Sequence, residues 1–140
     1  MPTLQLKISP PQNPVRQQAL ADGLTRLTAQ HLSKRAEVTA VMVENVPAQS
    51  WFVAGRSVTR ATAFLEISVT AGTNTTQQKA AFIDAAFTEL GVQLGDQSEG
   101  SPLEPASYVI VRELPASDWG YGGQTQAARQ QAREATHSFA

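Results

Sequence analysis

Residues 109–119 read VIVRELPASDW, and residues 41–51 read VMVENVPAQSW. In both copies an apolar run leads into proline and alanine, then two polar residues and a tryptophan, and a glycine follows four positions later. Pro115 and Pro47 are 68 residues apart, as are the two tryptophans, and this offset is close to half of the 140-residue chain. A repeat at a fixed period reflects repeated architecture. We therefore predict two fused copies of one structural unit.

The first copy follows a strand and a helix. Residues in Pro2–Ser9 alternate between apolar and polar side chains, which is the pattern of a strand with one buried face. Asn13 followed by Pro14 is a favoured helix start, and leucines at helical spacing continue to about Leu32. A second strand is predicted over Val38–Val46. The first unit is therefore strand, helix, strand.

The second unit repeats this order. A strand is predicted over Thr62–Val69, a helix over Gln77–Leu94 and a closing strand over Tyr108–Leu114. The helix residues expected to face inward are Ile83, Phe87, Leu90 and Leu94. The remaining segments are a hairpin or edge segment at Trp51–Gly55, a link between the units at Arg56–Arg60, a polar loop at Asp96–Ala106 and a solvated helix over Gln124–Ala140.

These elements predict an α/β (α+β) fold in a single domain over residues 1–140. The internal units cover about 2–60 and 61–126, and a tail covers about 127–140. A strand-helix-strand crossover makes its two strands parallel, so two units give a four-stranded sheet with two helices on one face. The other face is too mixed for a simple core, with Thr3, Gln5, Lys7, Thr62, Phe64 and Glu66. We expect neighbouring subunits to cover it.

Composition narrows the functional classes. The chain has 11 Lys and Arg against 12 Asp and Glu, a balance that does not indicate binding to nucleic acid or to an anionic membrane. It has no cysteine, and it has no apolar run of the ~20 residues that a membrane span needs. His31 and His137 are read as a helix-face and a tail residue, so no metal site is expected. Without a signal-peptide pattern, we expect a soluble, cytoplasmic protein.

The second copy of the repeat resembles a known family. Residues 113–123, ELPASDWGYGG, are similar to the closing strand and hairpin of the 4-oxalocrotonate tautomerase group. Two further features agree: Pro2 follows Met1 directly before a strand, and residues 69–75, VTAGTNT, precede a helix. The resemblance covers the chain from Pro2 to about Gln126. It implies the tautomerase fold, and a homotrimer in which fused chains surround a central barrel of sheets.

The resemblance also implies that Pro2 is the catalytic residue. Removal of Met1, which is usual before a small residue, would leave Pro2 as a secondary amine. A neutral α-amino group, with a pKa of ~8 that burial lowers further, can take up a proton and return it elsewhere. In the family this is keto–enol tautomerisation of a 2-oxo or 2-hydroxy acid, with no cofactor. If Met1 is retained, Pro2 is an amide and cannot act as a base. The second unit begins at about Ala61, so it supplies no amine.

The carboxylate-binding residues differ from the family pattern. Ala40 and Tyr108 stand where the family carries a strand arginine, and Gln12 stands near its loop arginine. Candidates for the missing charge are Arg112, on one strand face with Tyr108, and Arg56; each can also be a solvated surface residue. Trp119 matches the family's aromatic wall residue, and Trp51 is its duplicate; both can be packing residues.

Two functional classes follow. The first is an isomerase using Pro2 on a small carboxylic acid, with dehalogenase or decarboxylase chemistry as Pro2-dependent variants. The second is a non-catalytic trimer of the same fold that binds a small acid or a partner.

Overall fold

A computed structural model describes residues 2–96 and 102–138 of the chain. Residues 97–101 of the predicted polar loop therefore lie outside the described part, as do Met1 and the side chain of His137. The main elements are β1 (Thr3–Ser9), α1 (Pro14–Leu32), β2 (Ala40–Asn45), β5 (Thr62–Thr70), α2 (Thr76–Leu94), β6 (Tyr108–Leu114) and α3 (Gln126–Ser138). Two short hairpins, β3 (Phe52–Val53) with β4 (Arg56–Ser57) and β7 (Gly120–Tyr121) with β8 (Gln124–Thr125), follow the repeated tryptophans.

Local sequence signals set the helix starts. The Asn13 side chain accepts a hydrogen bond from the Arg16 N–H (2.9 Å), and Pro14 occupies the first turn of α1. Thr75 and Gln78 form a reciprocal capping box at the start of α2. Such contacts satisfy amide groups that have no partner inside a helix. The predicted start of α1 is confirmed, and α2 begins one residue earlier than predicted.

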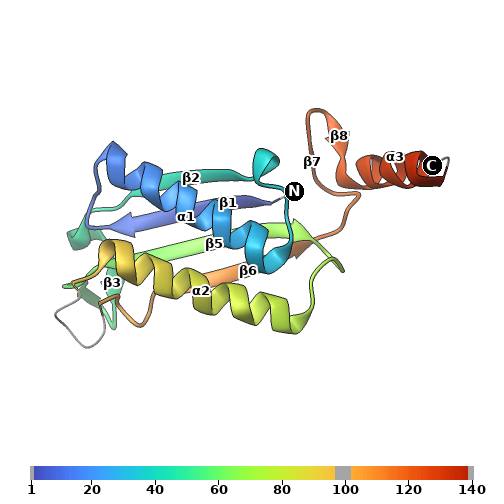
Figure 1. Cartoon of the computed structure of the whole chain (residues 1–140). Coiled ribbons are helices and arrows are strands. Elements are labelled where there is room, and N and C mark those ends of the chain that lie inside the picture. Colours follow the sequence, from blue (N-terminus) through green and yellow to red (C-terminus); the bar gives the residue numbers. More distant parts are fainter. Residues whose placement is uncertain (1, 97–101, 139–140) are drawn as a thin grey trace.

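The four long strands form one sheet in the order β2-β1-β5-β6 (Figure 1). β1 is parallel to β2, β5 is parallel to β6, and the two inner strands are antiparallel. Each unit thus places its inner strand at the centre and its outer strand at an edge, which relates the two units by an approximate twofold axis. The predicted fold, two β-α-β units in one sheet, is confirmed.

α1 and α2 lie side by side on one face of the sheet (Figure 1), as predicted. The core between them and the strands includes Leu4, Leu6, Ile8, Leu20, Leu24, Leu65, Ile67 and Leu90, all essentially inaccessible to solvent. The predicted inward face of α2 is wrong in part. Ile83 is 38% exposed, whereas Phe82 and Ala86, which were not chosen, are fully buried. Phe87 and Leu94 pack at the edge of the core.

No helix covers the opposite face of the sheet within the described chain. Met42, Gln5, Glu66 and Ile110 form one row across the four strands, and Glu44, Lys7, Phe64 and Tyr108 form the next. We call these residues the open face. Met42 is 54% exposed and Tyr108 64% exposed, as expected for a face that the helices leave uncovered.

The two copies of the repeat end differently. After Trp51, the hairpin β3–β4 includes Arg56 and Ser57, so the predicted link is partly hairpin. After Trp119, the hairpin β7–β8 leads directly into α3, which stands clear of the sheet (Figure 1). Gly120 closes this hairpin tightly, because a Cβ there would lie 1.9 Å from the Gln124 carbonyl oxygen.

Candidate active site

Pro2 lies at the start of β1, in the interior of the protein. The residue is buried, and its carbonyl oxygen accepts a hydrogen bond from the Ala40 N–H (3.2 Å). Thr3 is opposite Ser68 in the antiparallel pair, so Pro2 lies beside the last residues of β5, which end at Thr70. We call this end of the sheet the Pro2 end.

Trp119 is at the same end. Its indole N–H donates a hydrogen bond to the Thr70 hydroxyl oxygen (3.3 Å), and the Gln126 N–H donates to its carbonyl oxygen (2.9 Å). The turn after β6 therefore brings the repeated tryptophan next to the end of β5. Trp119 therefore lies at the Pro2 end of the sheet, and its role as the aromatic wall that the family resemblance implies stays a prediction.

Arg112 belongs to the Pro2 end but lies on the open-face side of the sheet. It is opposite Ser68 on β5, and its guanidinium forms an ion pair with Glu66 (3.1 Å). The side chain is 62% exposed. Pro2 continues the alternation of Leu4 and Leu6, which face the helices, so Arg112 and Pro2 are on different sides of the sheet within one chain.

The other predicted residues are at the far end of the sheet. Trp51 and Tyr108 line a cavity of about 290 Å³ together with Phe52, Val53, Ala54, Ala63, Phe64 and Ala106. Arg56 is in the adjoining hairpin, opposite Val53. Tyr108 shares a row with Lys7, and Lys7 is roughly 15–20 Å from Pro2 along β1. One chain therefore does not bring Trp51, Arg56 and Tyr108 together with Pro2.

A larger cavity at the Pro2 end is lined by residues that the sequence analysis did not single out. Its volume is about 460 Å³, and its lining residues are Ser33, Lys34, Arg35, Thr70, Thr73, Gln126, Gln130, Arg133 and Glu134. Thr70, the partner of the Trp119 indole, is one of them. We call this space the cationic cavity, because three of its lining side chains are basic and one is acidic.

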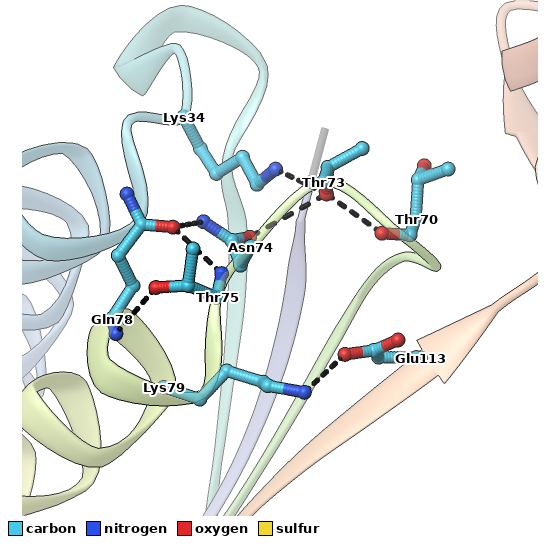
Figure 2. Close-up of polar contacts among 8 residues, drawn as sticks. All are labelled: Lys34, Thr70, Thr73, Asn74, Thr75, Gln78, Lys79 and Glu113. Atoms are coloured by element: carbon cyan, nitrogen blue, oxygen red, sulfur yellow. Dashed lines mark hydrogen bonds and ion pairs between the residues drawn. The ribbon is translucent and has the colours of Figure 1, made fainter.

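Lys34 is held in place by the turn before α2. Its ammonium donates a hydrogen bond to the Thr73 hydroxyl (2.8 Å), and that hydroxyl donates to the Thr70 carbonyl oxygen (2.7 Å) (Figure 2). Asn74 fixes the same turn to the end of α1 by donating to the Leu32 carbonyl oxygen (3.0 Å). Burial lowers the pKa of Lys34, because a partly desolvated ammonium is less stable than one in water.

The one sequence signal for this cavity was the pair of adjacent basic residues, Lys34 and Arg35, directly after α1. Ser33 ends α1 in a left-handed conformation (φ 56°), which turns the chain and directs the following residues toward the Pro2 end. The sequence analysis proposed no site residue in this segment. Arg133 gave no such signal, because its position depends on where the tail helix packs.

The described residues hold no group of three histidine, cysteine, aspartate or glutamate side chains that could bind a metal ion. Among the same residues, no helix is long and apolar enough to cross a membrane.

The fold matches solved structures of fused tautomerases. A fused 4-oxalocrotonate tautomerase (4-OT) described as a symmetric trimer gives a TM-score of 0.76 at 24% sequence identity, covering 91% of this chain and 98% of that one. A native fused 4-OT gives 0.75 at 25% identity, covering 90% and 97%. A member of the cis-3-chloroacrylic acid dehalogenase family gives 0.75 at 20% identity, covering 96% and 91%.

No protein-family model and no curated protein sequence matches the chain. The structural likeness confirms the resemblance at the level of fold: the chain has the fold of the fused tautomerases over about nine-tenths of its length.

Proposed function

We propose that this chain, which has the fused tautomerase fold, is a cofactor-independent tautomerase in which Pro2 is the general acid and base. Its substrate class is a small 2-oxo or 2-hydroxy acid. The observation that carries the proposal is the burial of Pro2 at the start of β1, at the end of the sheet where the cationic cavity opens. The proposal requires that Met1 be removed.

The chemistry needs only one amine. The neutral Pro2 nitrogen takes the proton from the enol hydroxyl of the substrate, and the resulting ammonium gives a proton to the substrate carbon. The product is the keto acid, and the amine returns to its neutral form. Burial disfavours the ammonium, so we expect the Pro2 pKa to lie below the ordinary value of ~8.

We further propose a homotrimer in which sites form between subunits. The open face supports this assembly, because Met42, Tyr108 and Ile110 are exposed there, and the fused 4-OT neighbours include trimers. A subunit interface could bring Trp51, Arg56 and Tyr108 of one chain to the Pro2 end of another. It could also place Arg112 beside a neighbouring chain's site. These four residues and Trp119 remain our candidates for binding substrate, and a cytoplasmic location remains a prediction.

A Pro2-dependent dehalogenase or decarboxylase is the second candidate. The likeness to a dehalogenase-family member favours this alternative, because the same fold occurs in a protein of that family. A non-catalytic binding trimer is the third. It would be the better account if Met1 were retained, since Pro2 would then be an amide without basicity.

The test is ketonisation of phenylenolpyruvate and of 2-hydroxymuconate by protein whose N-terminus has been verified by mass spectrometry. We expect turnover without added cofactor, with a rate that rises with pH and levels off above the Pro2 pKa. Pro2→Ala keeps a primary amine and should retain part of the activity. No turnover of either enol by protein that lacks Met1 would contradict the tautomerase proposal and leave the other two.

A further inference from the structure

The cationic cavity is built by two parts of the chain that are far apart in sequence. Lys34 and Arg35 follow α1, and Gln126, Gln130 and Arg133 come from α3. α3 lies after the second copy of the repeat, so it is not part of the duplicated unit. The start of the tail helix is fixed to the turn after β6 and to the hairpin, because the Ala127 N–H donates to the Ala116 carbonyl oxygen (2.9 Å) and Arg129 donates to the Tyr121 carbonyl oxygen (3.0 Å).

The basic groups in this cavity are only partly neutralised. Arg35 is 3.7 Å from Glu37, an exposed pair of the kind that contributes little. Lys34 contacts a neutral hydroxyl, and among the residues that the structure describes Arg133 makes no hydrogen bond or ion pair. Glu134, which accepts a hydrogen bond from Gln130, is the one acidic lining residue. Three positive charges and one negative charge leave an excess of two.

The second unit has a position equivalent to the cationic cavity, after the end of α2. Comparison with it shows that the positive charge of the cavity is not a consequence of the duplication. α1 and α2 are both 19 residues long, and Lys34 follows the end of α1 by two residues, as Asp96 follows the end of α2. Asp96 lines a cavity at the far end of the sheet with Arg60 as the basic residue there. Among the described residues, this second cavity is lined by one basic and one acidic side chain, and Arg133, on α3, has no counterpart in its lining.

We propose that the cationic cavity is a binding site for a small dianion, held by Lys34 and Arg35 after α1 and by Arg133 of α3. An excess of two positive charges matches two anionic groups, and about 460 Å³ falls in the usual range for small-molecule sites. The Ser33, Thr70 and Thr73 side chains add hydroxyl groups at the same wall. An anion would also compensate the Lys34 ammonium for its incomplete solvation.

The proposed ligand is a small molecule with two negative charges. Dicarboxylates and phosphates both have this property. The proposed site does not depend on catalysis by Pro2. Binding is therefore measured on the full chain with one extra residue before Pro2, because that residue converts the amine to an amide and prevents catalysis. Isothermal titration calorimetry at low salt with succinate and with inorganic phosphate separates the two sources.

Arg133→Ala should weaken binding of the preferred anion at least tenfold, as should Lys34→Gln. Arg16→Ala removes the same charge from an exposed position of α1 and should leave binding unchanged. Because Arg133 is exposed and outside the core, its replacement should not alter the unfolding midpoint, which a parallel melt checks. Saturable binding of either anion that depends on Arg133 supports the site. Binding of neither anion to the full chain, or equal affinities of Arg133→Ala and Arg16→Ala, would overturn it.

Discussion

At the residue scale, the ion pair between Lys79 and Glu113 shows how a surface contact connects two elements. Lys79 in the first turns of α2 donates to the Glu113 carboxylate near the end of β6 (Figure 2). The hydrogen bond from Lys79 is the main reason that the Glu113 pKa is lowered. A carboxylate with a lowered pKa in the folded state stabilises the protein above its ordinary pKa, and this contribution is lost as pH falls through the lowered value.

The pair therefore makes a pH-dependent prediction. Lys79→Met should reduce the unfolding midpoint in urea at neutral pH, and it should also reduce the loss of stability on acidification. Arg16→Met, which removes a charge from an exposed side chain, is the control and should leave the acid response as in the wild type. An unchanged acid response in Lys79→Met would mean that the pair does not contribute to stability.

Single residues also show where sequence reasoning stopped. Pro2 was proposed from the family resemblance, which rests on local sequence: a proline directly before the first strand and the repeated motif. The cationic cavity could not be proposed, because Lys34 and Arg133 meet only when the tail helix is placed in space. Trp51 and Arg56 are likewise separated from Pro2 by the length of β1, because they lie at its carboxyl end and Pro2 lies at its amino end. A pattern of residues along the chain does not show this separation.

At the scale of elements, the helix starts and all four long strands could be predicted from the sequence. Capping residues and strand alternation are local signals, and here they agree with the tertiary structure. The inward face of α2 was predicted correctly at Leu90 but not in the first half of the helix. α2 packs against α1 as well as against the sheet, and its buried stripe runs through Phe82, Ala86 and Leu90.

This corrected phase can be tested by two neighbouring substitutions. Phe82→Ala removes a fully buried ring and should cost about 3–5 kcal/mol of unfolding free energy. Ile83→Ala removes a side chain that is 38% exposed and should cost less, on the order of 1 kcal/mol. Urea denaturation of the two variants gives the comparison. Equal losses of unfolding free energy, or a larger loss for Ile83→Ala, would contradict the burial of Phe82 and support the inward position first predicted for Ile83.

At the scale of the whole molecule, the open face predicts assembly. Ile110→Lys puts a charge in the row of the open face that contains Met42, Gln5 and Glu66, where a neighbouring subunit would bury it. The substitution should therefore convert the proposed trimer to monomers. Val15→Lys is the matched control, because Val15 is 80% exposed at the start of α1 on the helix side. Sedimentation velocity distinguishes the species. A wild-type chain that stays monomeric at micromolar concentration would contradict the trimer and the sites between subunits.

The central claim is that the amine of Pro2 carries out the reaction. The most direct measurement compares the rate of phenylenolpyruvate ketonisation by two matched proteins, one beginning at Pro2 and one carrying a single extra residue before it. The extension turns the amine into an amide and leaves every other residue of the chain the same. We predict that the protein beginning at Pro2 is active and that the extended protein stays at the uncatalysed rate. Equal rates for the two proteins would contradict the claim.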